Sequence, residues 1–418
     1  MSAVNKKFFE DFTSIPIRDQ SLPNHFDAGE VIHIALNFTG TRLAYSRSDG
    51  SVRIWSMMNE GGRESVVIES PHTKPVELLC FNPQEEFVFL TVARDEYIRV
   101  WRTNGVLQRE VQVKSPVNKS GKGSDKANVI LQHVGYSSDG QIVVVADREG
   151  WIYGFDALFA PIFSVDVGEY VYSIMWFHFE HKYFACGLQD GSIPIFELVE
   201  KSSEHQLLYE IRKLTTLRGH RSSVTCLAID PRGIYFAAGS NEGVVLIWKN
   251  ETMLVTRVIS DIDEAVTDLD ISRDGTYVAV SFDRTASGKI YDISLGDKIY
   301  DIPNSLSGSQ VTPQIRWFPQ KTTFVYVGDK GRNVVLMKRP EEGLRKRADD
   351  KMGRLGDGDG VKGRDIRDSR TNKDHRENRD KRITRESRES RESRDNRDRD
   401  IRHRDKDTQK RRLHHQRY

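Results

Sequence analysis

Two histidines and their neighbours are the first residues of this chain that suggest chemistry. Each histidine precedes an acid or a hydroxyl and then a tryptophan: His72, Asp95 and Trp101, and His220, Ser240 and Trp248. A histidine with a carboxylate or hydroxyl is the residue set of acid–base and nucleophilic catalysis. In both cases, however, the tryptophan ends a strand-like pattern that recurs along the chain. We therefore interpret His72 and His220 as structural side chains rather than catalytic ones.

No other pattern of catalysis or metal binding is found in the sequence. HExxH, Walker-type Gly-Lys-Ser/Thr and paired metal-ligand spacings do not occur, and GDGDG at 356–360 lacks the glutamate that closes a calcium loop. The three cysteines, Cys80, Cys186 and Cys226, form no CxxC pair, and each lies in an apolar strand-like run. We expect core cysteines, no enzyme activity, no metal and no cofactor.

Seven stretches of the chain share one strand-rich pattern. They span 31–55, 76–101, 129–155, 171–196, 224–248, 266–291 and 312–337. Each contains an alternating strand, a turn rich in Gly, Pro, Asp or Asn, a small-apolar strand, a tight turn and a third strand. Six of them end on an aromatic residue. A period of roughly 40–55 residues of this kind is typical of WD-type propeller blades. The sequence predicts an all-β, seven-bladed WD40-type β-propeller.

In WD blades a histidine, a tight-turn aspartate, a serine or threonine and a tryptophan form a hydrogen-bonded chain that locks the blade. The fifth stretch has the fullest set, although Glu242 stands at the aspartate position. The second stretch keeps the histidine, aspartate and tryptophan, and the first keeps Asp49 and Trp55 without a histidine. We expect all these side chains to be structural.

The seventh stretch lacks a fourth strand after Met337, because RPEEGLRKR follows. The spare strand-like stretch FTSIPIR (12–18) is predicted to complete the last blade and remove its open edge. The predicted organisation is a flexible N-terminal arm at 1–11, a propeller at 12–340 closed by 12–18, and a disordered tail rich in Arg, Asp, Glu and Ser at 341–418.

The tail carries 27 Lys+Arg against 19 Asp+Glu, which leaves 36 against 42 for the rest of the chain. RESRESRESRDNRDRD (385–400) is itself neutral, so the basic excess lies outside it. Cations release counterions from phosphates, and a tyrosine can stack on a base. The candidate RNA contacts are Arg402, Arg404, Lys406, Lys410, Arg411, Arg412, Arg417 and Tyr418. A phosphorylation switch and a solubilising spacer stay open as alternatives.

A second basic segment, 114–128, joins the second and third stretches and carries Lys114, Lys119, Lys122 and Lys126. It is either a solvated loop or a contact for RNA or an acidic partner. The N-terminal MSAVNKKFFEDF lacks a signal-peptide pattern, and no apolar run is long enough to cross a bilayer. We expect a soluble intracellular protein without membrane partners.

Several motifs make the body similar to the WD-repeat subunit of the THO complex, part of the TREX assembly that couples transcription to mRNA packaging and export. They are IDPRGIYFAAGS (229–240) followed by VVLIW, AVTDLDISRDG (265–275), GDKIYDI (296–302) and IRWFPQK (315–321). The resemblance covers 31–337, and the charged tail resembles the fungal form.

The resemblance implies a nuclear, non-catalytic subunit that docks on a large helical scaffold protein among other THO subunits. It also implies an indirect link to a DEAD-box RNA helicase. Two alternatives stay open: a WD40 adaptor of a splicing, chromatin or ubiquitin-ligase complex, and an RNA-binding protein that acts through its basic tail.

Overall fold

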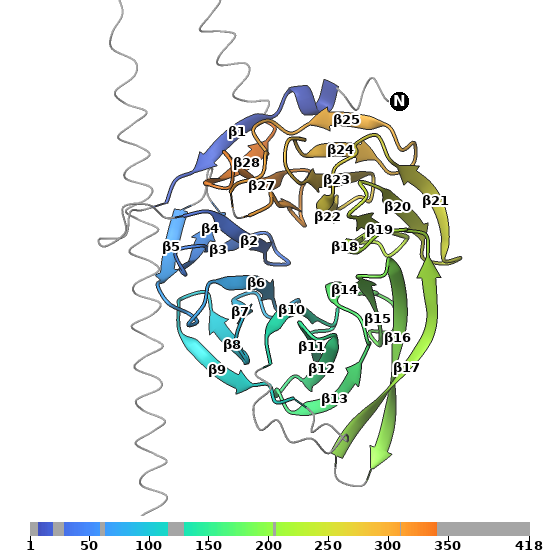
Figure 1. The fold of residues 1–418 in the computed structure, drawn as a ribbon. Helices are drawn as coiled ribbons and strands as arrows, with labels where there is room; N and C mark the ends of the chain where they lie inside the picture. Colours follow the sequence, from blue (N-terminus) through green and yellow to red (C-terminus); the bar gives the residue numbers. More distant parts are fainter. Residues whose placement is uncertain are drawn as a thin grey trace, which may run out of the picture. The chain divides into compact units, whose positions relative to one another are not determined.

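The computed structural model describes residues 7–19, 29–58, 63–115, 129–203, 206–309 and 311–340. The described residues form seven four-stranded antiparallel sheets around a central axis (Figure 1). This is the seven-bladed all-β propeller that the sequence predicts. The predicted tail at 341–418 lies outside the described residues.

Blades 1 to 6 follow the chain from the axis outwards, each as four consecutive strands. Blade 1 is β2 (Val31–Leu36), β3 (Arg42–Arg47), β4 (Val52–Ser56) and β5 (Arg63–Ile68). Blade 2 is β6 (Val76–Phe81), β7 (Val88–Ala93), β8 (Tyr97–Arg102) and β9 (Leu107–Gln112). Blade 3 is β10 (Leu131–Tyr136), β11 (Ile142–Asp147), β12 (Trp151–Asp156) and β13 (Pro161–Asp166).

Blades 4 to 6 repeat the arrangement. Blade 4 is β14 (Val171–Trp176), β15 (Tyr183–Leu188), β16 (Ser192–Ser203) and β17 (Gln206–Arg218). Blade 5 is β18 (Val224–Ile229), β19 (Tyr235–Ser240), β20 (Val245–Lys249) and β21 (Leu254–Ile259). Blade 6 is β22 (Val266–Ile271), β23 (Tyr277–Phe282), β24 (Lys289–Asp292) and β25 (Lys298–Asp301).

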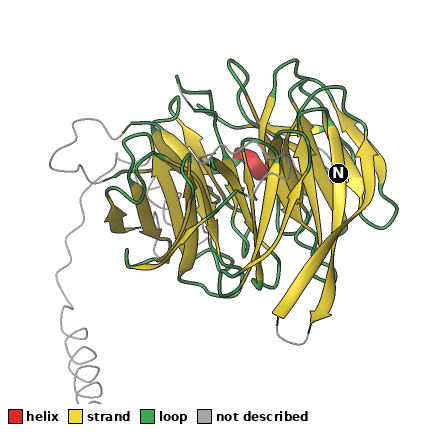
Figure 2. Ribbon diagram, turned by 60° about the horizontal axis from the view of Figure 1, so that its bottom comes forward, coloured by secondary structure: helices red, strands yellow, loops and turns green. Residues whose placement is uncertain are grey.

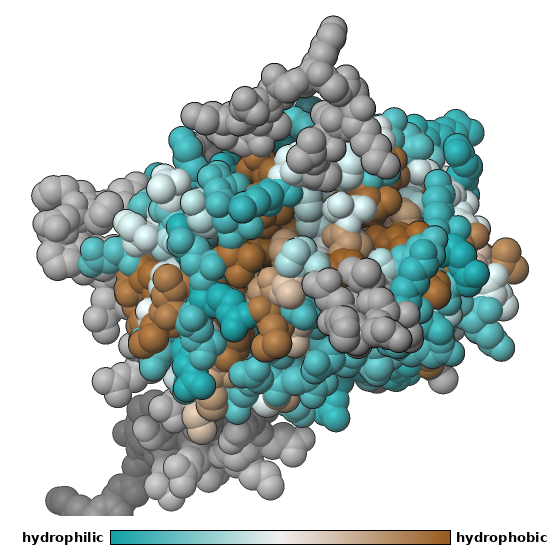
Figure 3. Space-filling model, turned by 90° about the horizontal axis from the view of Figure 1, so that it is seen from below, coloured by the Kyte–Doolittle hydropathy of each residue, from teal (hydrophilic) through white to brown (hydrophobic). Residues whose placement is uncertain are grey.

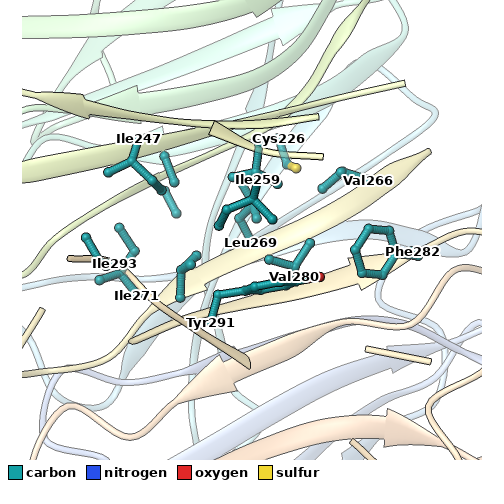
Figure 4. Close-up of a cluster of buried hydrophobic side chains, with 14 residues drawn as sticks. Cys226, Ile247, Ile259, Val266, Leu269, Ile271, Val280, Phe282, Tyr291 and Ile293 are labelled. Carbon is teal, nitrogen blue, oxygen red and sulfur yellow. The ribbon is translucent and has the colours of Figure 1, made fainter. Parts of the chain in front are cut away.

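The core lies between neighbouring blades because each sheet is covered on both faces. The second strands β7, β11 and β23 are therefore buried along their whole length, and they read as continuous apolar or small runs. Between blades 5 and 6, side chains such as Ile247 and Ile259 meet Leu269, Val280 and Tyr291 (Figure 4). Since one blade cannot bury its own faces, each depends on its neighbours.

A register shift marks the outer half of blades 1 to 6. In each, the pairing of the third and fourth strands slips at the aromatic that ends the sequence pattern: Trp55, Trp101, Phe155, Phe196, Trp248 and Tyr291. In blade 7 the corresponding residue is Met337, and it pairs with Ser14 without a shift. Bulges of this kind re-aim a side chain, and here they accompany the large rings.

Blade 7 takes its fourth strand from the other end of the chain. It consists of β26 (Ile315–Trp317), β27 (Phe324–Gly328), β28 (Asn333–Lys338) and β1 (Thr13–Ile17), with β1 antiparallel to β28. The two chain segments lie side by side in Figure 1. Closure pairs the edge of β28 that would otherwise lack main-chain hydrogen bonds.

Residues 7–11 are not the flexible arm that their position led us to expect. A helical turn at 7–10 (Figure 2) places Phe9 fully inside the core between blades 6 and 7. The Phe9 ring lies 5.1 Å from that of Tyr277 and 6.3 Å from that of Trp317, centroid to centroid. Hydrophobic burial of these aromatics offsets the entropy of ordering the segment, which position in the chain alone does not reveal. Residues 1–6 lie outside the described residues.

Beyond β1, a buried ionic cluster fixes the same segment to blade 1. The Asp19 carboxylate lies 2.5 Å from the Arg47 guanidinium and 3.5 Å from that of Arg53, and the Tyr45 hydroxyl donates to it. Burial raises the pKa of the Tyr45 hydroxyl, and the Asp19 charge adds to that rise. The N-terminal segment is thus held by aromatic packing on one side of β1 and by charge on the other.

The strand order defines two faces of the disc. Turns between the first and second and between the third and fourth strands lie on one face, which we name the hairpin face. Turns between the second and third strands and the connections between blades lie on the other, the crossover face.

The pairing of β16 with β17 continues from Leu198 to Ser203, beyond the pairing of β16 with β15, and this extension projects from the disc (Figure 2). The rim viewed in Figure 3 mixes hydrophobic with hydrophilic side chains.

Replacing Phe9 with alanine should lower the free energy of unfolding by about 3–5 kcal/mol, because a buried ring is removed from the blade 6–7 core. Phe38→Ala is the control, since Phe38 is 42% exposed and should change stability by less than about 0.5 kcal/mol. Urea unfolding followed by tryptophan fluorescence measures both. Equal effects of the two substitutions would contradict a structural role for the N-terminal turn.

Candidate functional site

In blade 2 the candidate catalytic residues form a closed structural chain. The His72 ring lies with Nδ1 2.9 Å from Asp95 Oδ2 and Nε2 2.7 Å from Thr91 Oγ1. Trp101 Nε1 donates to the same Thr91 hydroxyl at 3.0 Å. Arg99 Nη1 also lies 2.7 Å from His72 Nδ1, and the threonine hydroxyl accepts from tryptophan. Every ring nitrogen of His72 is engaged and its side chain is fully buried.

Sequence reasoning missed Thr91 in this chain. It lies on β7, whose six residues are all buried, so it reads as one more member of an apolar strand. Its signal was its place ten residues before Trp101; the fifth stretch has Ala238 at that place, and Ser240 corresponds to Ala93. At Asp95, burial opposes ionisation, but the hydrogen bonds with His72 and the Tyr97 amide and the charge of Arg99 outweigh it and lower the pKa of the carboxyl group. Asp95 is therefore a charged hydrogen-bond acceptor at neutral pH.

In blade 5 the expected chain does not close, although this stretch has the fullest sequence signature. His220 Nδ1 lies 3.6 Å from Glu242 Oε1, and neither ring nitrogen has a hydrogen-bond partner among the described residues. Ser240 Oγ donates to the Val244 carbonyl at 3.2 Å, and the Trp248 ring nitrogen has no described partner. Glutamate carries one more methylene than aspartate, so its carboxylate does not take the place that Asp95 has in blade 2. Burial lowers the pKa of His220.

In blade 1 the expected side chains are also apart. Asp49 accepts hydrogen bonds from the Ser51 amide at 2.8 Å and the Ser51 hydroxyl at 2.6 Å, which shape its own turn. The Trp55 ring nitrogen is buried without a partner among the described residues. The structure therefore assembles His72, Asp95 and Trp101 and leaves the other candidates unconnected.

Replacing His72 with alanine should cost more stability than the same change at His220. His72→Ala removes the hydrogen bonds of the ring to Asp95 and Thr91, which should add about 1–3 kcal/mol to the loss, although Asp95 keeps Tyr97 and Thr91 keeps Trp101. His220→Ala removes a ring of equal burial that makes no hydrogen bond with described residues. Urea unfolding of the two variants measures the difference; equal losses would show that the blade 2 chain adds no net stability.

Carboxylates on β22 hold the short inner strand of blade 7. Asp268 accepts from the Ile315 amide at 3.0 Å and pairs with the Arg316 guanidinium, and Asp270 accepts from the Trp317 amide at 2.6 Å. Burial raises the pKa of Asp270 to about 7, although Arg316 pulls it down. Burial also raises the pKa of Asp268. β26 is the innermost strand of blade 7 and pairs only with β27, so these carboxylates bind amides on its free edge.

Asp270 should make the protein less stable as pH rises. Its folded pKa of about 7 exceeds the unfolded value of 3.8, so its contribution is complete below the unfolded value and is lost as pH rises through 7. Asp270→Asn keeps a neutral acceptor and should remove this part of the pH dependence.

Thermal unfolding between pH 5 and 8 compares Asp270→Asn with the parent chain. Asp274→Asn is the control: Asp274 lies on an exposed turn, and hydrogen bonds from Ser272 and Thr276 outweigh burial and lower its pKa. Its difference from the parent should stay constant over this range. A constant difference for Asp270→Asn as well would disprove the titration.

No group of three or more His, Cys, Asp or Glu side chains suited to a metal occurs within the described ranges. The three cysteines are free thiols; Cys186 and Cys226 are buried and Cys80 is partly buried. Burial raises the pKa of all three, so the thiols stay protonated at neutral pH. In the same part of the chain no helix is long and apolar enough to span a membrane.

The exposed large hydrophobic side chains gather on the hairpin face. Ten of the thirteen among the described residues lie on or next to its turns: Phe38, Met58, Phe87, Val106, Leu107, Leu158, Phe179, Ile234, Leu254 and Leu295. The other three, Leu214, Val255 and Val258, lie within outer strands. The described loops of the crossover face contain none. Exposed apolar patches mark protein–protein contacts, so the two faces differ in what they can bind.

A groove of about 360 Å³ opens on the same face between blades 2 and 3. Its lining includes Gln84, Gln108, Arg109, Gln141 and Phe159. The Arg109 guanidinium lies 5.8 Å above the Phe159 ring and donates to the Leu158 carbonyl. The groove thus combines polar side chains with an apolar edge, which suits a protein segment better than a small apolar ligand.

The basic candidates lie almost entirely outside the described residues. Lys114 is exposed at the end of the blade 2 outer strand, whereas Lys119, Lys122 and Lys126 are not described. The tail candidates from Arg402 to Tyr418 are not described either. Of the aromatic residues in or beside turns, Phe177 and Phe282 are buried, Trp151 is partly buried and Phe179 is 44% exposed.

Two stretches of the chain, 18–56 and 211–249, match the family model described as WD domain, G-beta repeat. The second runs from the outer strand of blade 4 to the third strand of blade 5, so the sequence repeat is offset from the structural blade. The chain carries WD40 repeats.

The chain is also similar to individual curated proteins. The chain is similar to THO complex subunit 3 of Arabidopsis thaliana, 24% identical over 322 residues that cover 76% of this chain and 92% of that protein. It is similar to Protein TEX1 of Saccharomyces cerevisiae, 23% identical over 338 residues, 78% of this chain and 74% of the relative. WD repeat-containing protein AAC3 of Dictyostelium discoideum is 23% identical over 245 residues, 54% and 47% of the two chains.

Proposed function

We propose that this protein is a non-catalytic scaffold subunit of a nuclear THO/TREX-type complex that couples transcription to mRNP assembly and mRNA export. The observation that carries the proposal is the similarity to THO complex subunit 3 over 92% of that protein. The likeness to Protein TEX1 across 78% of this chain supports it. The buried, hydrogen-bonded state of His72 supports a structural role for the residue set that most resembled a catalytic site.

The hairpin face is the proposed docking surface for the large helical scaffold subunit. Its turns from blades 1 to 3 expose Phe38, Phe87, Leu107 and Leu158, and the groove between blades 2 and 3 opens on the same face. The turns touch one another through hydrogen bonds, since Asn37 donates to the Glu86 carbonyl at 3.2 Å. Exposed apolar side chains on turns that hydrogen-bond to one another fit the apolar side of a packed helix. Other THO subunits, and a DEAD-box RNA helicase indirectly, complete the proposed assembly.

RNA contact through the basic tail is a second proposal. It rests on the excess of 27 Lys+Arg over 19 Asp+Glu in 341–418, with the candidate contacts between Arg402 and Tyr418. In this proposal the propeller binds the protein subunits and the tail binds RNA.

Purification of the tagged full chain from its own cells under native conditions tests the assembly. A stoichiometric large helical subunit and other THO subunits are expected. A Phe87→Asp, Leu158→Asp double variant should lose the helical subunit at least about tenfold, because two carboxylates would be buried unpaired in the contact. Leu214→Asp is the control, since Leu214 is 45% exposed on the outer strand β17.

Histones or cullins in place of THO subunits would overturn the proposed assembly and favour another WD40 adaptor. Retention of the helical subunit by the double variant would overturn only the docking face. In the same purification, residues 1–340 alone should keep the subunits and lose salt-sensitive RNA. Equal RNA recovery with and without the tail would reject the tail as an RNA contact.

A further inference from the structure

We draw no further inference here: the strongest candidate, the groove between blades 2 and 3 on the hairpin face, carries nothing beyond the docking surface already proposed, because its lining includes both Arg109 and Glu85 and nothing in the structure shows what covers it.

Discussion

The pairing of β1 with β28 is the constraint on which the rest of the structure depends. Every blade buries its faces against two neighbours, so an open ring would expose the flanks of blades 1 and 7 and an unpaired edge of β28. The N-terminal segment prevents this with three different interactions: main-chain pairing along Thr13–Ile17, the buried ring of Phe9, and the Asp19 carboxylate beside Arg47 and Arg53. Long-range closure links residues more than 300 positions apart, so the chain cannot complete its last blade from local contacts.

Within the closed ring, the buried polar side chains of different blades differ in how completely they are hydrogen-bonded. The His72 chain satisfies all its buried nitrogens, while blade 5 buries His220 and Trp248 without described partners. At the joints between blades, side chains bond to main-chain groups instead. Asp268 and Asp270 join blade 6 to blade 7, and Gln314 joins blade 7 to blade 1, with its Oε1 accepting from Ile34 at 2.9 Å. Apolar side chains can pack against more than one blade. A hydrogen bond needs a correctly placed partner, so these bonds favour one neighbouring blade over the others.

The rigid ring separates its surfaces by chemistry. Apolar turns collect on the hairpin face, and the crossover face has none in its described loops. A propeller with these surfaces can bind several segments at once without changing shape, because the turns and edges are held by the blades beneath them. Such a part suits the assembly of a larger complex better than chemistry on a small molecule.

The sequence by itself determined the number of blades, the order of their strands and the aromatic residues of the third strands in blades 1 to 6, although each of these strands continues past its aromatic. Those features depend on alternation and turn residues within a few positions, which act locally. It also marked the closing strand, because the seventh stretch lacks a fourth. Only the tertiary structure decided which histidine is bonded, since one methylene separates Glu242 from an aspartate and leaves its carboxylate 3.6 Å from His220. It likewise decided that Phe9 is core, that Asp270 meets Trp317 and that scattered apolar turns share one face. These are through-space relations between distant residues, and no local pattern encodes them.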